Sequence, residues 1–270
     1  MSAAASRAAP RYDLLMPDRP LTLMTVHAHP DDETIGTGGT MAKAVKAGHR
    51  VVLVTCTRGE LGEIVVPDMD TPDNHRRLGE IRASELEEAM GVLGVTEWDN
   101  LGYRDSGMMD DAGNRDPRSF WRADLDEAAG RLAWLIRRHK PDVVTTYNAF
   151  GGYGHPDHIR VHDVAIRAVP RAGDASWYPE QLEDGIEPWA PAKFYEQATP
   201  ASVRRAMNER LIELGVDSFW LPPADATLKI CGGDVSDDFE NTTNPPPGRG
   251  ALIAPPSAIR LGAPPAAGTT

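Results

Sequence analysis

Short β-rich stretches alternate with longer amphipathic stretches along most of this 270-residue chain, and this alternation limits the fold more than any other feature. The predicted strands are Leu21–Ala28, Arg50–Thr57, Trp98–Tyr103 and Asp142–Asn148. The predicted helices are Ile35–Ala47, Pro72–Leu93, Phe120–His139 and a stretch from about Asp157 to Ala168. Strands that alternate with helices indicate βαβ units, and continuous apolar strands indicate burial on both faces. The predicted fold class is therefore α/β, a mostly parallel sheet with helices on both faces.

The C-terminal part of the chain is less regular. A further strand and helix are expected at Ala192–Gln197 and Ala201–Leu214. From Thr243 to Thr270 the chain has seven Pro and four Gly among 28 residues, and two Arg are its only charged residues. We expect this tail to be disordered, because such a composition cannot form a packed core. The predicted organisation is an N-terminal extension, a main domain, an atypical segment and the tail, at residues 1–20, 21–215, 216–242 and 243–270.

The charge balance excludes several classes of partner. Asp and Glu outnumber Lys and Arg by 40 to 28, for a net charge of −12, which argues against binding to nucleic acid or to an anionic membrane. No apolar stretch approaches the roughly 18 residues of a membrane span, and the N-terminus lacks the apolar segment of a signal peptide. Two cysteines, Cys56 and Cys231, are too few for a disulfide framework. We therefore expect a cytoplasmic protein without membrane insertion, and its oligomeric state stays open.

The end of the first predicted strand carries an unusual cluster of polar residues. Residues 27–33 read His-Ala-His-Pro-Asp-Asp-Glu, and the two-residue period of a strand places His27 and His29 on one face. Pro30 marks the turn, because proline cannot continue a central strand. Helix capping would explain part of the acidic stretch but neither histidine. A divalent cation explains the cluster better, since it binds neutral imidazole and carboxylate oxygen at close range.

A second polar cluster follows the fourth predicted strand. Residues 151–158 read Gly-Gly-Tyr-Gly-His-Pro-Asp-His, so a His-Pro-Asp unit again stands at the carboxyl end of a strand, after glycines that allow a tight turn. Ligands of parallel α/β sheets bind beyond this edge, and two such units there predict a shared metal site. His158 and His162 share one helix face, but a lone helix histidine is usually structural, and we interpret His162 in that way.

Other residues near the same edge are open to more than one interpretation. Residues 36–39 read Gly-Thr-Gly-Gly and loosely resemble a dinucleotide-binding turn. A pyrophosphate there would face the three preceding carboxylates, so close packing of helix on sheet explains these glycines better. The loops 57–63 and 102–107 mix charged residues with glycine, which is as typical of solvated loops as of binding sites.

The helix predicted at 72–93 carries charges on its apolar side. At about 100° per residue, Arg82 and Glu85 fall within the arc of its apolar residues. Charged groups on a buried face need partners. Two interpretations stay open: a structural ion pair between Arg82 and Glu85, and an arginine that Glu85 holds and that binds a polar substrate.

Five stretches of the chain together resemble one known family. They read AHPDDETIGTGG, TCTRGELGE, GEIRASEL, YRDSGM and GGYGHPDH, in chain order. In these motifs the chain is similar to the LmbE-like, or PIG-L, family of zinc-dependent de-N-acetylases, and within it to the mycothiol-pathway enzymes that act on N-acetylglucosaminyl-inositol or on mycothiol S-conjugates. The resemblance covers roughly residues 21–215 and implies a Rossmann-like fold with one catalytic zinc. Beyond residue 215, where family members often shape the substrate cleft, the sequence has no convincing match.

The resemblance also implies roles for individual residues. Two histidines and one aspartate would bind the metal: His29, Asp32 and His158. Asp31 would be the general base, and Asp157 would orient His155. Tyr153 would assist at the carbonyl oxygen, where His155 would stabilise the oxyanion or donate a proton. The residues expected to bind substrate are Arg82, Asp105, Glu60 and Glu63. Two histidines and an aspartate suit Zn²⁺, and Fe²⁺ would fit similar ligands.

The activity implied is hydrolysis of an N-acetyl or other N-acyl amide on a glucosamine-type small molecule, such as N-acetylglucosaminyl-inositol, by metal-activated water. An N-acylated amino sugar would then be the binding partner. Alternatives within this reaction class are a mycothiol S-conjugate, a glycolipid and an antibiotic intermediate. A metal-binding protein without turnover is an alternative of another class, although Asp31 and His155 argue against it. A nucleotide-binding oxidoreductase is a more distant alternative.

Overall fold

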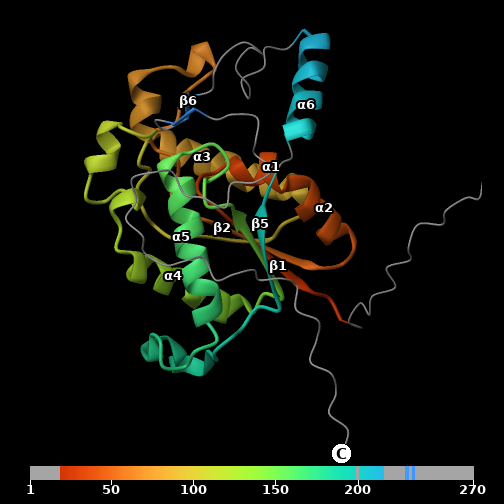
Figure 1. Cartoon of the computed structure of the whole chain (residues 1–270), viewed down its shortest axis with the longest axis vertical. Coiled ribbons are helices and arrows are strands. Elements are labelled where there is room, and N and C mark those ends of the chain that lie inside the picture. Colours follow the sequence, from red (N-terminus) through yellow and green to blue (C-terminus); the bar gives the residue numbers. More distant parts are fainter. Residues whose placement is uncertain (1–18, 199–200, 216–228, 231–232, 235–270) are drawn as a thin grey trace, which may run out of the picture. The chain divides into compact units, whose positions relative to one another are not determined.

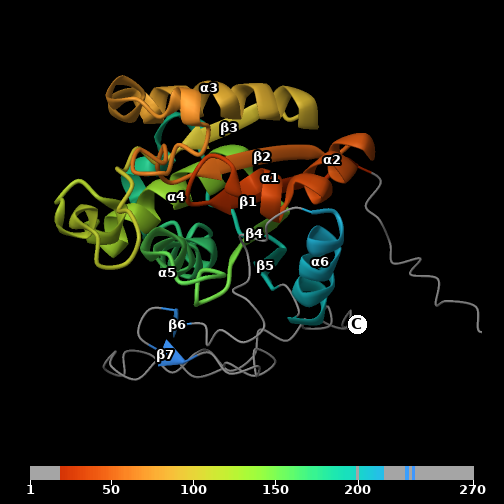
Figure 2. The same cartoon turned by 90° about the horizontal axis from the view of Figure 1, so that it is seen from above.

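The computed structural model describes residues 19–198, 201–215, 229–230 and 233–234. Two units divide after Ala198, and the first contains a sheet of five strands. These are β1 (Thr22–His27), β2 (Arg50–Thr55), β3 (Glu97–Asn100), β4 (Val143–Tyr147) and β5 (Lys193–Gln197). Their order is β3-β2-β1-β4-β5, and all four pairings are parallel. Figure 1 labels β1, β2 and β5 of this sheet, and Figure 2 labels all five strands. The predicted α/β class is confirmed.

The strand order determines where a site can form. From β1 the chain adds β2 and then β3 on one side, and it returns to place β4 on the other side of β1. Leu23 of β1 pairs with Val143 of β4, so the loops that follow these two strands lie next to each other. Such a reversal is the usual ligand site of an open α/β sheet. Both His-Pro-Asp units lie at this reversal.

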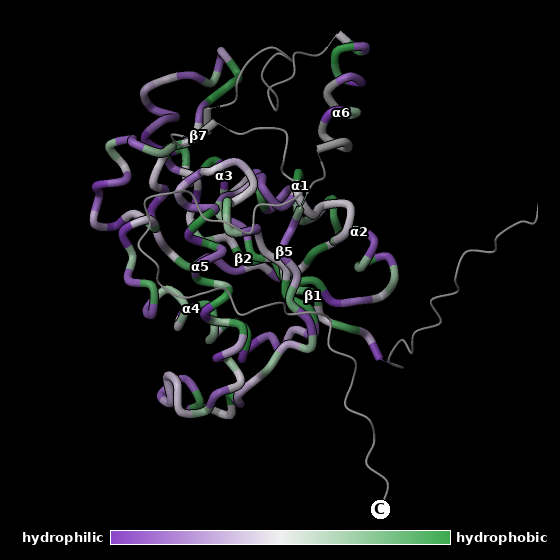
Figure 3. The backbone as a smooth tube through the Cα atoms, viewed as in Figure 1, coloured by the Kyte–Doolittle hydropathy of each residue, from purple (hydrophilic) through white to green (hydrophobic). Residues whose placement is uncertain are grey.

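Helices cover both faces of the sheet (Figure 2). The helices α4 (Leu125–His139) and α5 (Pro156–Arg171) pack on one face, and α2 (Gly38–Lys46) and α3 (Pro72–Leu93) pack on the other. Alternate residues of β2 face two hydrophobic cores, one on each side of the sheet. Val52 and Val54 pack with α4 and α5, and Val51 and Leu53 pack with α2 and α3. Figure 3 shows the resulting apolar centre in β1 and β2.

The prediction of one continuous helix at Ile35–Ala47 is wrong. The structure contains a short α1 (Asp32–Gly36) and then α2, separated by Thr37 with φ −130°. Thr37 Oγ1 lies 2.9 Å from Nε2 of buried His27 and donates to the carbonyl of Glu33. These side-chain contacts hold Thr37 outside helical geometry, and a helical periodicity does not show them.

The other helices differ mainly at their ends. The bounds of α3 are as predicted: Thr71 accepts a hydrogen bond from the N–H of Asn74, and Gly94 ends the helix with φ 73°. The helix α4 starts at Leu125 and not at Phe120, because Asp124 caps it. Short 3₁₀ turns complete this unit: η1 (Pro67–Met69), η2 (Ala112–Arg115), η3 (Phe120–Arg122) and η4 (Pro179–Gly185).

The described part of the second unit is small. It consists of α6 (Ala201–Glu213) and the antiparallel pair β6 (Lys229–Ile230) and β7 (Gly233–Asp234). The predicted tail 243–270 and most of the predicted segments 1–20 and 216–242 lie outside the described residues, and the domain limits stay predictions. Among the described residues, no helix is long and apolar enough to cross a membrane.

Candidate metal centre and active site

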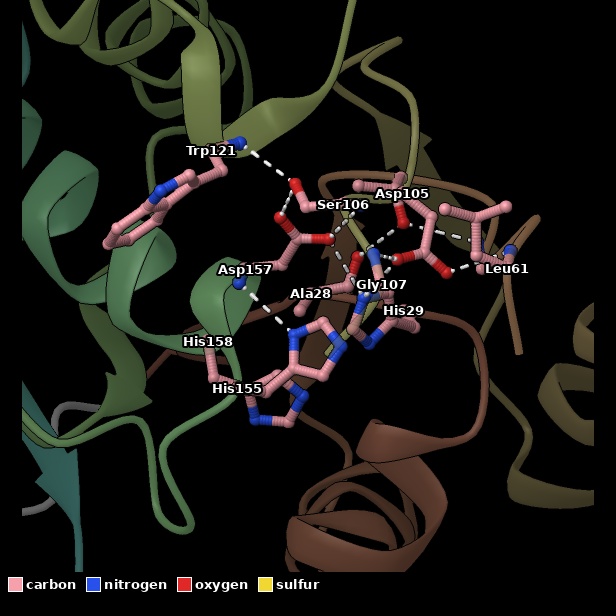
Figure 4. Close-up of polar contacts among 12 residues, drawn as sticks. Ala28, His29, Leu61, Asp105, Ser106, Gly107, Trp121, His155, Asp157 and His158 are labelled. Carbon is pink, nitrogen blue, oxygen red and sulfur yellow. Dashed lines mark hydrogen bonds and ion pairs between the residues drawn. The ribbon is translucent and has the colours of Figure 1, made fainter. Parts of the chain in front are cut away.

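The loops after β1 and β4 bring His29, His155, Asp157 and His158 together (Figure 4). His29 follows β1, and the turn after β4 leads to His155, which is the N-cap of α5. The ring centroid of His29 lies 4.7 Å from that of His155 and 5.3 Å from that of His158. These three side chains are buried, although more than 120 residues of sequence separate the two loops.

His158 presents a free lone pair to this cluster. Its Nδ1 lies 3.1 Å from the carbonyl oxygen of Gly151, and because a carbonyl only accepts, Nδ1 carries the proton. Its Nε2 is buried and has no hydrogen-bond partner. Tyr147 stacks on the imidazole at 4.3 Å and holds the ring in place. An unpartnered nitrogen in this tautomer is suited to bind a metal ion.

His29 presents its other nitrogen in the same way. Its Nε2 lies 3.1 Å from Oδ2 of Asp157, and this buried carboxylate also accepts from the N–H and the hydroxyl of Ser106. Nε2 therefore donates to Asp157, which leaves a lone pair on Nδ1. A histidine that donates one N–H to a carboxylate while its other nitrogen is free has the arrangement found in metal sites.

Asp32 joins the two free nitrogens. Its Oδ2 lies 3.4 Å from Nδ1 of His29 and 3.3 Å from Nε2 of His158. Each contact joins two acceptors when the histidines are neutral, so either a proton on the imidazole or a metal ion would stabilise it. Two ligand atoms about 2.1 Å from a tetrahedral ion lie about 3.4 Å apart, which matches both distances. Two of the three donor separations in the predicted set of His29, Asp32 and His158 therefore match those around a metal ion.

Among the described residues, two donor sets have all their ligand atoms within 4.8 Å of one another, and the set of His29, Asp32 and His158 is not one of them. One replaces Asp32 with His155, and the other consists of His29, Asp105 and Asp157. The first is disfavoured because Nδ1 of His155 accepts the N–H of Asp157 at 3.1 Å, so a neutral ring carries its proton on Nε2. The second would use Nε2 of His29, which donates its N–H to Asp157 in the arrangement described above.

The pKa shifts follow from burial and from these contacts. Burial by itself lowers the pKa of His29, but Asp105, Asp157 and Asp32 raise it well above its usual value. Burial raises the pKa of Asp32, and the two histidines outweigh it and hold the pKa well below its usual value. For His155, burial and the charges of the other two histidines lower the pKa to about 3. His155 is therefore neutral near pH 7 and can donate Nε2–H.

Asp31 has a strained backbone at the edge of the cluster. Its φ is 109°, a region that residues with side chains rarely adopt, and such strain is concentrated at functional sites. Its side chain is 60% exposed, and Arg82 Nη2 donates to its Oδ2 at 2.6 Å. Partial desolvation raises the pKa of Asp31, Arg82 lowers it, and Asp32 raises it further, with a net upward shift. A carboxylate in this position is a stronger base than an ordinary aspartate.

Arg82 reaches the site from α3, as one of the two interpretations allowed, but Glu85 does not hold it. Glu85 is exposed, which corrects its predicted place on the buried face. The guanidinium instead donates to Asp31 and to the carbonyls of Pro30 and Gly59. A Cβ at Gly59 would lie 2.0 Å from Nη1 of Arg82. The glycine in this loop thus leaves room for the arginine.

Asp157 contacts two histidines. Its backbone N–H donates to Nδ1 of His155, in agreement with the predicted partner. Its carboxylate, however, contacts His29, a contact that the sequence does not predict. Ser106, which the sequence did not single out, holds this carboxylate through two hydrogen bonds. Its only sequence signal is its place in the loop 102–107, beside Asp105.

The remaining predicted residues lie around this centre in different ways. Tyr153 is 38% exposed, and its ring centroid lies 4.8 Å from that of His158. Asp105 is buried beside His29, and Glu60 accepts its backbone N–H. Glu63 is exposed on the same loop as Glu60. His162 donates to the carbonyl of Tyr147, in agreement with a structural role.

The sequence of the chain matches the family described as GlcNAc-PI de-N-acetylase over residues 24–169. It is also 48% identical over 202 residues to a 1D-myo-inositol 2-acetamido-2-deoxy-alpha-D-glucopyranoside deacetylase of Geodermatophilus obscurus, which covers 73% of this chain and 67% of that one. The chain belongs to the PIG-L family. A second deacetylase of this name, from Catenulispora acidiphila, is 43% identical over 89% of this chain and 76% of its own length.

A solved structure extends the PIG-L assignment to the fold. The N,N'-diacetylchitobiose deacetylase from Pyrococcus horikoshii is 26% identical, has a TM-score of 0.55, and covers 71% of this chain and 67% of its own. Across eight curated PIG-L relatives, the matched region covers 63 to 76% of the relatives' length. About a third of a typical relative thus has no counterpart in the match.

Proposed function

We propose that this protein is a metal-dependent N-deacetylase that hydrolyses the acetamide of a glucosamine-type small molecule. The observation that carries the proposal is the pair of free histidine nitrogens that face one carboxylate oxygen at 3.3 and 3.4 Å, with a base and a hydrogen-bond donor beside them. The name of the PIG-L family and those of its curated relatives describe the same reaction.

Zn²⁺ is the metal we propose, held by His29, Asp32 and His158. Two neutral imidazoles and one carboxylate leave coordination positions free, as a catalytic zinc requires. When bound, such a cation lowers the pKa of a coordinated water and polarises the amide carbonyl. Fe²⁺ would accept the same donors, so metal analysis of the purified protein has to decide between them.

Asp31 would act as the general base. Its carboxylate is accessible, and the pKa is raised, so it can accept a proton from the attacking water. Water adds to the amide carbon, and Asp31 holds the proton that the water loses. The C–N bond then breaks, and the amine leaves with the proton that Asp31 returns, because a neutral His155 has no acidic proton to supply.

His155 would stabilise the negative charge that develops on the carbonyl oxygen. The backbone N–H of Asp157 fixes its tautomer, and the low pKa keeps the ring neutral, so Nε2–H is a donor set in place before reaction. Tyr153, at the exposed rim near His155, is the second candidate donor to this oxygen. Substrate binding stays a prediction for Arg82, Asp105, Glu60 and Glu63.

N-acetylglucosaminyl-inositol is the substrate we propose first. The curated relatives named above are named for this compound, and the family match spans residues 24–169, which include His29, Asp32 and His158. The residues after 215 lie almost entirely outside the described part. A related N-acetylglucosamine derivative or a mycothiol S-conjugate is therefore included in the test.

The decisive experiment measures primary-amine release by the zinc-loaded protein. The substrates are N-acetylglucosamine, N-acetylglucosaminyl-inositol and a mycothiol S-conjugate. We expect Asp31→Asn to retain zinc and to lose about 10²–10⁴-fold of turnover, the usual contribution of a general base. Full activity of this variant would refute the role of Asp31. Zinc binding without amine release from any substrate would refute the proposed function and favour a protein that only binds metal.

A further inference from the structure

Glu33 is a buried carboxylate that the proposed mechanism does not use. It is 1% exposed, although it directly follows two other acidic residues, Asp31 and Asp32. Burial of a carboxylate next to two others is costly, because desolvation and like charges both oppose it. Among the described residues, neither of the two donor sets with ligand atoms within 4.8 Å of one another includes Glu33. Its hydrogen bonds therefore have to explain why it is buried.

The carboxylate of Glu33 binds the backbone of Asp31. Its Oε2 accepts the N–H of Asp31 at 3.0 Å, and its Oε1 accepts the hydroxyl of Thr34 at 2.7 Å. The two contacts involve different oxygens, so the contact with Thr34 fixes the rotation of the carboxylate. A hydrogen bond to a carboxylate is stronger than one between neutral groups. Glu33 therefore holds the N–H of Asp31 in place.

Two side chains bind the peptide group between Pro30 and Asp31 at its two ends. Glu33 accepts its N–H, and the guanidinium of Arg82 donates to its carbonyl oxygen. The φ angle of Asp31 describes the rotation of this planar peptide relative to the Cα atom that carries the side chain. Contacts at both ends therefore hold φ at 109°, a strained value that persists only where the surrounding structure enforces it.

The φ angle determines where the carboxylate of Asp31 lies. A relaxed residue with a side chain has negative φ, and that change would rotate the Cα–Cβ bond away from its present direction. The side chain of Asp31 is 60% exposed, so packing does not hold it. The backbone conformation and the contact with Arg82 are what keep this carboxylate beside the metal centre.

We propose that Glu33 is a positioning residue for the proposed general base Asp31. Its carboxylate holds the backbone N–H of Asp31, enforces the strained φ angle and so keeps the base beside the attacking water. The inference rests on the proposed function for the role of Asp31, whereas the backbone contact is independent of that role. If Glu33 were only a cap of the short helix α1, its loss would change stability and not the turnover of the folded enzyme.

Two substitutions separate the hydrogen bond of Glu33 from its charge. Glu33→Gln loses the charge and keeps an acceptor oxygen of the same reach. Glu33→Asp keeps the charge, but its side chain is one methylene shorter, so the acceptor no longer reaches the N–H of Asp31. We expect Glu33→Asp to lower kcat about 10- to 100-fold, the effect of one lost hydrogen bond to a charged group. Glu33→Gln should stay close to wild type.

KM and zinc affinity should not change in these variants. The N–H of His29 holds the carboxylate of Asp32 at 2.9 Å, a contact that does not involve Glu33. Zinc affinity is measured by competition with a chromogenic chelator. The control is Glu88→Asp, which makes the same change at an exposed position of α3 and should leave all three quantities at the wild-type value.

Amide hydrogen exchange of Asp31 tests the contact without metal and without turnover. It is measured by NMR in the zinc-free, isotope-labelled full chain. An amide exchanges when its hydrogen bond opens, so we expect exchange about 10- to 100-fold faster in Glu33→Asp. Glu33→Gln should exchange at close to the wild-type rate. Equal exchange rates in wild type and Glu33→Asp would overturn the proposal.

The kinetic results can also overturn it. If Glu33→Gln loses as much turnover as Glu33→Asp, the charge and not the hydrogen bond is responsible. If KM rises at constant kcat, or if zinc affinity falls enough to explain the loss, Glu33 does not act by positioning the base. Each of these results overturns the proposal.

One substitution replaces Glu33→Asp if circular dichroism shows that it does not fold. Thr34→Val frees Oε1 of Glu33 and leaves the carboxylate in the chain. Faster exchange of the Asp31 amide with a lower kcat supports the proposal, and unchanged values overturn it. If the zinc-loaded wild type releases no amine, the proposed deacetylation is refuted, and amide exchange alone then decides whether Glu33 holds Asp31.

Discussion

Steady-state kinetics can show whether Arg82 positions the proposed base Asp31 or binds the substrate. In the structure its guanidinium joins Asp31 to the carbonyls of Pro30 and Gly59 and so holds the proposed base against a strained backbone. We expect Arg82→Met to lower kcat and to change KM little. The Asp31 side chain is 60% exposed, so without the arginine it can turn into solvent and away from the attacking water.

The magnitude follows from the contact that is lost. A hydrogen bond between charged groups, here 2.6 Å long, contributes about 1.5–3 kcal/mol net. If this free energy is used to hold the base in the transition state, kcat falls about 10- to 100-fold, since each ~1.4 kcal/mol is a factor of ten. This loss is smaller than that expected for Asp31→Asn. Arg82→Lys should lie between wild type and Arg82→Met, because one nitrogen cannot span all three acceptors.

The assay is amine release at saturating Zn²⁺, with kcat and KM determined separately. Gly59→Ala is an independent perturbation: its Cβ would lie 2.0 Å from Nη1 of Arg82 and would displace the guanidinium without removing it. Arg77→Met is the control, since Arg77 is an exposed arginine of the same helix. If Arg82→Met raises KM and leaves kcat unchanged, Arg82 binds the substrate equally in the ground and transition states, and the positioning role is refuted.

Two further predictions concern metal binding and stability. Gly151→Ala should weaken zinc binding in a chelator titration, because its Cβ would lie 2.6 Å from Cβ of His158. Gly152→Ala is the control: its φ is also positive, but no atom lies near its Cβ, so zinc binding should not change. Equal effects of the two variants on zinc affinity would contradict this reasoning. The pKa of Asp142 is lowered, chiefly by its hydrogen bond from Arg19. This contribution to stability is present above the unfolded-state pKa of ~3.9 and is lost as pH falls through the folded pKa. We therefore expect the free energy of unfolding in urea to fall less for Asp142→Asn than for wild type between pH 5 and about 3. If the two free energies fall in parallel with pH, Asp142 does not make this contribution.

Sequence patterns predict a helix or strand correctly where the residues that start and end it are its own neighbours in the sequence. The bounds of α3 were predicted correctly, because Pro72 and Gly94 mark its two ends in the sequence. The break between α1 and α2 was not predicted, since the contact that causes it joins Thr37 to His27 across a turn. The strand pattern also does not predict that Tyr147 stacks on His158, because the two residues lie on different elements.

The sequence by itself determined the fold class and the edge at which the site forms. Strand periodicity and the two His-Pro-Asp units place the proposed metal ligands at the carboxyl ends of β1 and β4, because parallel strands end at a common edge. Only the tertiary structure decided which carboxylate faces which histidine. Asp157 lies 128 residues from His29 and contacts it because β4 returns beside β1. Sequence spacing does not encode such pairings, and these pairings set the tautomers, the free lone pairs and the position of the base.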